Sequence, residues 1–176
     1  DPLTQLYNRR YVFNIFRDAL KRYRRYAEPF SLIMIDADHF KRINDQYGHS
    51  AGDAALRAIA DACNSAVRES DVVGRFGGEE FIILLPHTEA ADAALVAERI
   101  RRTMLRDTCY WQGQELDITL SLGVAEAGPV TDTLDKLVKA ADQALYEAKT
   151  SGRNRTVVAE VVQQAERNSL PEIKAA

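Results

Sequence analysis

Apolar residues recur at helical spacing in five stretches of the chain, each with polar residues on the opposite side. The spacing predicts helices over about 7–26, 39–47, 53–67, 88–106 and 133–150. Thr88 is the expected N-cap of the fourth helix, because a threonine hydroxyl can accept a hydrogen bond from a free amide of the first turn. Gly152 is the expected stop of the fifth helix. The apolar stripes imply that the helices pack on a common core.

Short apolar runs between the predicted helices are typical of strands. We expect strands over about 30–35, 71–76, 79–85, 116–124 and 156–159. Gly77 and Gly78 separate the second strand from the third, which predicts a hairpin, because glycine adopts a positive φ at little cost. Strict alternation over 116–124 predicts a strand with one buried face. The order αβααββαβαβ favours an α/β (α+β) sandwich with a central, mostly antiparallel sheet flanked by helices.

Composition indicates one globular domain. The 176 residues are 46% hydrophobic and 28% charged, and the apolar runs are far shorter than the ~20 residues that span a bilayer. The net charge of −3 disfavours a nucleic-acid clamp but leaves room for a small anion held by a local cationic cluster. Two cysteines argue against a disulfide framework and fit a reducing cytoplasm, with Cys63 expected to fill the core.

The ends of the chain suggest a piece of a longer protein. We expect a folded domain over 1–160 and a polar tail over 161–176. Because the first residue is Asp1 rather than methionine, we also expect an upstream region in the parent protein.

Two groups of acids stand beside predicted strands. Asp36 and Asp38 end the first apolar strand, where carboxylates are costly unless a cation meets them, and hard divalent metals prefer oxygen ligands. Glu79 and Glu80 follow the two glycines and point to opposite faces of their strand, so only one of them can meet Asp36. The alternatives are a polar strand end for the first group and a plain turn for the second.

Three basic residues could supply the matching positive charge. Lys149 and Arg153 lie four apart at the end of the last predicted helix, and Lys41 follows the first acid group. Acids beside cations are the combination that metal-assisted phosphoryl chemistry uses. The alternative for Lys149 and Arg153 is a favourable interaction with the helix dipole alone.

Several separated motifs make the chain similar to the GGDEF domain of bacterial diguanylate cyclases, in its GGEEF variant, from Asp1 to about Thr156. The motifs that carry the resemblance are Asp1 to Thr4, Asn8 to Arg10, Asp36 to Lys41, Asn44 to His49 with Gly52 and Asp53, Arg75 to Phe81, and Ala141 to Asn154. The resemblance implies a fold related to polymerase palms and nucleotidyl cyclases. It also implies a reaction in which two GTP molecules form cyclic di-GMP and release two pyrophosphates.

The resemblance further implies roles for individual residues. Asp36, the backbone carbonyl of Ala37 and Glu79 resemble the ligands of Mg²⁺ (or Mn²⁺), and Glu79 also resembles the acceptor of the 3′-hydroxyl proton. Lys41 resembles the group that stabilises the transition-state phosphate, with Glu80 beside it in the catalytic set. The implied substrate-binding residues are Asn44 and Asp53 for guanine, Lys149 and Arg153 for the triphosphate, and Phe40, His49, Gly77 and Gly78.

Arg68 and Asp71 match an Arg-x-x-Asp product-inhibition site at the family's usual offset before the two glycines. Arg99, from a neighbouring protomer, is a further expected contributor. The alternative is an ion pair between Arg68 and Asp71 at a helix end, which would contribute only tenths of a kcal/mol.

The product has two-fold symmetry while the chain has one set of implied guanine-binding residues, so we expect a homodimer whose formation is required for turnover. The expected partners are therefore GTP, cyclic di-GMP and a second copy, in the cytoplasm, without nucleic acid. Contact with a membrane is expected only through an upstream region. Rival interpretations are a non-catalytic module that senses GTP or cyclic di-GMP, an adenine-using cyclase, and a polymerase palm.

Overall fold

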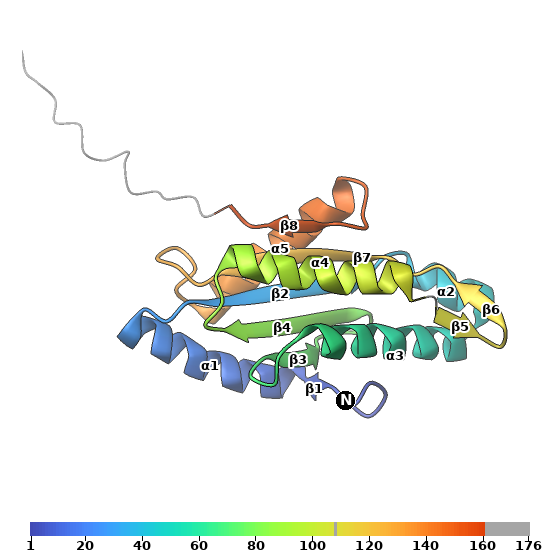
Figure 1. Ribbon diagram of the computed structural model, residues 1–176, viewed down its shortest axis with the longest axis horizontal. Coiled ribbons are helices and arrows are strands. Elements are labelled where there is room, and N and C mark those ends of the chain that lie inside the picture. Colours follow the sequence, from blue (N-terminus) through green and yellow to red (C-terminus); the bar gives the residue numbers. More distant parts are fainter. Residues whose placement is uncertain (108, 161–176) are drawn as a thin grey trace, which may run out of the picture.

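The computed structural model describes residues 1–107 and 109–160, which form a central sheet with helices on both faces (Figure 1). In chain order the elements are β1 (Tyr7–Asn8), α1 (Arg9–Tyr26), β2 (Phe30–Ala37), α2 (Phe40–Tyr47), α3 (His49–Ala66), β3 (Val72–Arg75), β4 (Glu80–Pro86), α4 (Ala90–Arg106), β5 (Cys109–Trp111), β6 (Gln114–Leu116), β7 (Leu120–Glu126), α5 (Leu134–Thr150) and β8 (Thr156–Val158). The expected tail over 161–176 lies outside the described residues. Within them, no helix has both the length and the apolar character needed to cross a bilayer.

The main sheet has the strand order β1-β3-β4-β2-β7-β8 and is antiparallel at its centre. Only the outermost pairs, β1 with β3 and β7 with β8, are parallel. Strand β2 lies between β4 and β7, and all eight of its residues are buried, as expected for a central strand covered on both faces. The predicted fold class, a mostly antiparallel sheet flanked by helices, is confirmed.

Alternate residues of the central strands feed two separate cores. Ile33 and Ile35 of β2 pack in the core formed with α3 and α4, whereas Leu32 and Met34 pack in the core formed with α1 and α5. Cys63 is fully buried in the first core, which confirms its predicted packing role. Burial raises the pKa of its thiol to about 12. Because β2 and β4 pack in both cores, the positions of the residues at the ends of these strands are fixed.

The predicted strand over 116–124 is wrong in two respects. The chain leaves the ladder after Leu116, and a new strand, β7, begins at Leu120. The residues before the break belong to a separate two-stranded hairpin, β5 with β6, which was not predicted. Strand β7 is buried on both faces rather than one, because α5 packs on the face that the alternation suggested was solvated. Gly123 and Ala125 are the small residues on that face.

Two smaller corrections concern helix starts. Thr88 does not cap α4: the N-cap is Glu89, and the Thr88 hydroxyl donates to the Pro86 carbonyl. Helix α3 begins at His49 rather than near Asp53, because Gly48, at φ 84°, makes a sharp junction directly after α2. This junction brings α2 and the start of α3 together beyond the end of β2 (Figure 1).

Candidate active site

Asp36 and Glu79 meet at one end of the central strands. Asp36 lies near the end of β2, directly opposite Glu80 at the start of β4. The backbone amide of Ala37 donates to the carbonyl of Glu79 at 3.3 Å, so the turn before β4 is joined to the end of β2. Burial raises the pKa of the Glu79 carboxyl, and the negative charge of Asp36 raises it further. The two carboxylates are therefore electrostatic neighbours, as the sequence predicted.

Lys149 supplies a positive charge at this position. Its Nζ lies 2.7 Å from Oδ2 of Asp36, whose side chain is only 10% exposed. Burial nonetheless raises the pKa of the Asp36 carboxyl, while Lys149 and, more weakly, Arg153 act in the opposite direction. Burial is the largest cause of the raised pKa at both acids, so their charged forms are costly in the protein and a cation bound beside them would favour ionisation. Such a site favours an additional cation.

The acids fit a hard divalent cation such as Mg²⁺. The described residues contain no cluster of three or more acidic, histidine or cysteine side chains that could hold a metal by themselves. Mg²⁺ commonly binds through one or two carboxylates and completes its coordination with water and substrate phosphates. The carboxylates of Asp36 and Glu79 and the carbonyl of Ala37 fit such an open set of oxygen ligands. Because Lys149 already contacts Asp36, a cation bound there would share the Asp36 carboxylate with Lys149.

The Gly77-Gly78 turn is closed by its own backbone and by Arg75. The amides of Phe76 and Gly77 donate to the Glu80 carbonyl. A Cβ on Gly77 would come within 2.5 Å of Oε2 of Glu80, so the Glu80 carboxylate folds over the turn. A Cβ on Gly78 would meet nothing, which leaves the backbone there open to a ligand. Glu79 and Glu80 therefore occupy different environments, in agreement with the prediction.

Residues predicted to bind guanine gather where α2 meets α3. The side chains of Asn44 and Phe40 lie directly against Gly52, whose missing Cβ makes room for them. Asp53 follows on α3 and is partly buried, and His49 is the exposed first residue of that helix. This group lies beyond the end of β2, on the side of the molecule that carries Asp36 (Figure 1).

The predicted cations are not equivalent. Lys149 contacts Asp36, whereas Lys41 lies exposed in the first turn of α2 and has no ion-pair partner among residues 1–107 and 109–160. Arg153 is exposed in the loop after α5 and adopts a left-handed φ of 60°. Its charge reaches Asp36. The structure thus brings Lys149 and Arg153 to the acids and leaves Lys41 on the neighbouring helix.

A second predicted site lies after the end of α3, beside β1 and β3 at one edge of the main sheet. Arg68 and Asp71 line a cavity of about 350 Å³ that also includes Tyr7 of β1. Asp71 accepts from the backbone amide of Arg68 at 2.8 Å rather than from its guanidinium. In the described part of the chain the Arg68 side chain has no ion-pair partner, so the alternative of a simple Arg68–Asp71 pair is not what forms. Arg99 donates to the carbonyl of Ala66 at the end of α3, close to the same loop.

Two polar residues beside the acids have contacts that the sequence did not predict, although Asp38 was grouped with Asp36 as a carboxylate expected to meet a cation. The guanidinium of Arg75 donates to the Gly78 carbonyl at 2.7 Å and pairs with Asp1 at 3.2 Å, which ties the first turn of the chain to the two glycines. Asp38 is buried and accepts three hydrogen bonds. The sequence places Asp38 two residues after Asp36 and hydroxyl residues at 119 and 121. These residues can be recognised as partners only when the pairing of β7 with β2 is known.

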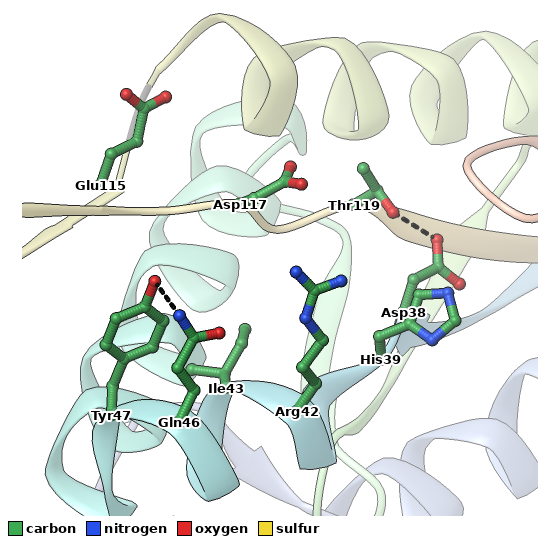
Figure 2. A pocket seen from close by; sticks show the side chains of 9 residues that line it. All are labelled: Asp38, His39, Arg42, Ile43, Gln46, Tyr47, Glu115, Asp117 and Thr119. Atoms are coloured by element: carbon green, nitrogen blue, oxygen red, sulfur yellow. Dashed lines mark hydrogen bonds between the residues drawn. The ribbon is translucent and has the colours of Figure 1, made fainter.

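A small polar cavity of about 110 Å³ lies between α2 and the segment that joins β6 to β7. Figure 2 shows Arg42 pointing from α2 into this space toward Asp117 and Thr119. Asp38 and His39 form its inner end, next to the start of α2 (Figure 2). The cavity is too small for a nucleotide.

The raised pKa of Glu79 predicts a stability effect. Since its folded pKa lies above its usual value, the cost of ionising Glu79 is absent in acid and grows as the pH rises through the folded pKa. Without divalent metal, Glu79→Gln should raise Tm at neutral pH by about 1–3 °C, and the difference should vanish below about pH 4. Thermal unfolding in a chelator at both pH values tests this, and an equal Tm at neutral pH would contradict it.

Comparison with known proteins gives consistent matches over nearly the whole chain. The model of the family described as "Diguanylate cyclase, GGDEF domain" matches residues 1–155. Diguanylate cyclase A of Treponema denticola is 37% identical over 174 residues, which are 97% of this chain and 45% of that protein. Response regulator PleD of Caulobacter vibrioides is 42% identical over 159 residues, which are 89% of this chain and 35% of that protein. The chain therefore spans less than half the length of these relatives.

A solved structure has the same fold. The coiled coil and GGDEF domain of DgcB from Caulobacter crescentus, in complex with c-di-GMP, superposes with a TM-score of 0.85 at 31% identity. The match covers 90% of this chain and 84% of that one. The similarity in fold agrees with the family match.

Proposed function

The chain belongs to the GGDEF family of diguanylate cyclases, and on this basis we propose that it condenses two GTP molecules into cyclic di-GMP with release of two pyrophosphates. The observation that carries the proposal is the meeting of Asp36 and Glu79 beside Lys149 at one end of the central sheet. Acidic oxygens and a cation at one rigid position are what nucleotidyl transfer requires.

In the proposed reaction, the 3′-oxygen of one GTP forms a bond to the α-phosphorus of the other, and the bond from that phosphorus to the pyrophosphate oxygen breaks. Glu79 accepts the proton of the attacking hydroxyl. Its raised pKa suits this task, because a carboxylate that is costly to ionise is a better proton acceptor than an ordinary one. The same transfer, repeated with the roles of the nucleotides exchanged, closes the ring.

We propose Asp36, the Ala37 carbonyl and Glu79 as the residues that hold Mg²⁺ or Mn²⁺. When bound, a divalent ion neutralises charge on the reacting phosphate and eases ionisation of the hydroxyl. The support is the pair of adjacent carboxylates with raised pKa values, one of them nearly buried. Lys149 lies 2.7 Å from Asp36 and would turn to the triphosphate as the carboxylate takes up the ion.

The remaining proposed contacts divide between phosphate and base. Lys149 and Arg153 bind the triphosphate, and Lys41 stabilises charge on the transferring phosphate from the first turn of α2. Asn44 and Asp53 bind guanine at the α2–α3 junction, where a carboxylate can accept from both N1–H and the 2-amino group. Adenine lacks this donor pair, so an acceptor there would lose its partner at a cost of about 1–3 kcal/mol. The remaining residues of the proposed site are Phe40, His49, Gly77, Gly78 and Glu80.

The active species is proposed to be a symmetric homodimer with the two sites facing each other. Each protomer then supplies one nucleotide and one set of acids. Product formation should therefore depend on dimer concentration. When purified domain, GTP and Mg²⁺ are incubated over a wide range of protein concentrations and the nucleotides are separated, the rate per protomer should fall on dilution below the dimer range.

The same assay tests the proposed function as a whole. Cyclic di-GMP as the product supports it. Binding of GTP without any product at protein concentrations that give dimer would overturn it in favour of a sensing module. A rate per protomer that stays constant through dilution would contradict only the dimer requirement.

We propose that the Arg68–Asp71 cavity binds cyclic di-GMP and inhibits the enzyme, with Arg99 contributing from a neighbouring protomer. The support is a guanidinium without an ion-pair partner among the described residues, beside a cavity of about 350 Å³, and the similarity to a GGDEF domain solved with c-di-GMP. Guanidinium groups suit both guanine edges and phosphates. Within this chain Arg99 is held at the end of α3, so its contribution would require release from Ala66.

Arg68→Ala is expected to weaken inhibition by added cyclic di-GMP by at least about tenfold while leaving the initial rate largely intact. The substitution removes a charged contact to the product and leaves Asp36 and Glu79 unchanged. Arg57→Ala is the matched control, because Arg57 is an exposed arginine of α3 that does not line the cavity. An unchanged inhibition constant in Arg68→Ala would refute the assignment.

A cytoplasmic location is part of the proposal, because GTP is a cytoplasmic metabolite. Any attachment to a membrane would be made by an upstream region of a longer protein.

A further inference from the structure

Asp38 has a different environment from Asp36, although the two lie two residues apart. Its side chain is 3% exposed and its carboxylate accepts three hydrogen bonds. Ser121 donates to Oδ1 at 2.7 Å, and Thr119 donates to Oδ2 at 2.8 Å. Figure 2 shows the Thr119 bond at the inner end of the small cavity.

The third donor comes from a distant part of the chain. The backbone amide of Asn154 donates to Oδ2 of Asp38 at 3.0 Å, across 116 positions of sequence. Both oxygens of Asp38 are therefore occupied by donors from the protein itself. This accounts for a buried carboxylate without any metal or substrate contact, and it distinguishes Asp38 from Asp36.

The loop that Asp38 holds has an unusual backbone. Gly152, Arg153 and Asn154 have φ values of 114°, 60° and 46° in succession. Left-handed conformations are unfavourable for residues with a side chain, so two of them in a row persist only where the surroundings hold them. The Arg153 amide donates to the Ala148 carbonyl at 2.9 Å, and the next amide donates to Asp38.

A second anchor fixes the same loop from the opposite side. Nη1 of Arg101 on α4 donates to the side-chain oxygen of Asn154 at 2.9 Å. Arg101 is itself paired with Glu98 at 2.9 Å, and Glu98 also accepts from the hydroxyl of Thr156. Asn154 is thus held by its backbone from Asp38, directly after β2, and by its side chain from α4.

We propose that Asp38 is a positioning residue, whose carboxylate fixes the backbone at Asn154 so that Arg153 is presented beside Lys149 to the phosphates of the substrate. This inference rests on the proposed function only for the identity of the substrate. Arg153 itself is exposed and has no side-chain partner within residues 1–107 and 109–160, so its direction is set by the loop backbone. The carboxylate of Asp38 does not touch the nucleotide.

The test compares the binding of two nucleotides to Asp38→Asn. An asparagine keeps the size of the side chain but replaces one acceptor oxygen by a donor and removes the charge that draws the Asn154 amide. Affinity for 3′-deoxy-GTP, which cannot be cyclised, should fall about tenfold. Affinity for GMP, which lacks the β- and γ-phosphates, should change by less than about twofold.

Arg153→Ala completes the test as a double-variant cycle. If Asp38 acts through Arg153, Asp38→Asn should cost no further triphosphate affinity in the Arg153→Ala background. Additive losses, or equal losses of GMP and 3′-deoxy-GTP binding, would overturn the proposal. These measurements use binding alone, so they remain decisive even if the domain forms no cyclic di-GMP.

Arg101→Leu provides an independent route should Asp38→Asn fail to fold. It releases the second anchor of Asn154 and leaves the end of β2 untouched. The same selective loss of triphosphate affinity is expected, and unchanged 3′-deoxy-GTP binding would count against the role of the loop. Thr119→Val is the matched control, because it removes one bond to Asp38 and keeps the contact with Asn154.

Discussion

Glu79→Gln is expected to lower the turnover of GTP to cyclic di-GMP by about a thousandfold, or about 4 kcal/mol of transition-state stabilisation. A neutral amide cannot accept the proton of the attacking hydroxyl, and its oxygen is a weaker ligand for a hard cation. Both losses act on the chemical step. Burial raises the pKa of the Glu79 carboxyl, so its charge is costly to the fold, and perturbed pKa values of this kind cluster at functional sites.

The comparison should be made by steady-state product analysis at a protein concentration that maintains the dimer. Glu89→Gln is the matched control, since Glu89 starts α4 beyond the other end of β4 and makes no side-chain cap. It should retain the wild-type rate. Near-normal turnover of Glu79→Gln, in protein that still binds 3′-deoxy-GTP, would remove Glu79 from the catalytic role.

Gly123→Ala is expected to have the largest effect on stability, about 3 kcal/mol or more, or a fall in Tm of roughly 6–12 °C. A Cβ on Gly123 would overlap the Ala141 carbonyl and the Leu145 amide, and it would lie 2.9 Å from the Cα of Leu145. These are backbone atoms of α5, so the helix must move away from β7 as a unit. Lys149 lies at the end of this helix and would move with it.

Thermal unfolding measures this loss, and Gly128→Ala is its control. A Cβ on Gly128 would meet only the Thr131 hydroxyl, at 3.4 Å, which is close to ordinary contact. The control should change Tm by no more than about 2 °C. If the two variants had equal Tm values, the close packing of α5 on β7 would not be a determinant of stability.

The acids and their strands could be predicted because the sequence patterns that mark them are local. Apolar residues before Asp36 marked β2, and the glycines before Glu79 marked the turn that leads into β4. Side-chain alternation on a strand then separated Glu79 from Glu80. Helix α5 could be predicted in the same way, because apolar residues recur at helical spacing over 133–150 and Gly152 marks the stop.

The predictions that were wrong depended on distant residues. Alternation continues through Ile118, but the ladder stops at Leu116 because the hairpin of β5 and β6 turns away from the main sheet. Strand β7 was predicted to have one solvent-exposed face because small residues such as Gly123 alternate with its large apolar residues. In the structure α5 covers that face. Helix α4 has no side-chain N-cap, and the side chain of Glu126 on β7 instead accepts from the amide of Ala90.

The contacts of Asp38 and Arg75 were missed for a related reason. The partners of Asp38 come from β7 and from the loop after α5, and those of Arg75 come from the first residue and the Gly-Gly turn. No spacing along the chain relates these segments. Residues that touch substrate tend to lie in compact motifs, whereas residues that position them are dispersed, and only the fold brings them together.

The proposed function requires that Asp36 and Glu79 together seat a divalent ion against a nucleoside triphosphate. The most direct measurement is a titration of Mn²⁺ with 3′-deoxy-GTP and the domain, followed by electron paramagnetic resonance. Wild-type protein should bind Mn²⁺ in the ternary complex, and Asp36→Asn and Glu79→Gln should each weaken it by about tenfold or more. Mn²⁺ affinity in the ternary complex that is unchanged in both variants would contradict the account.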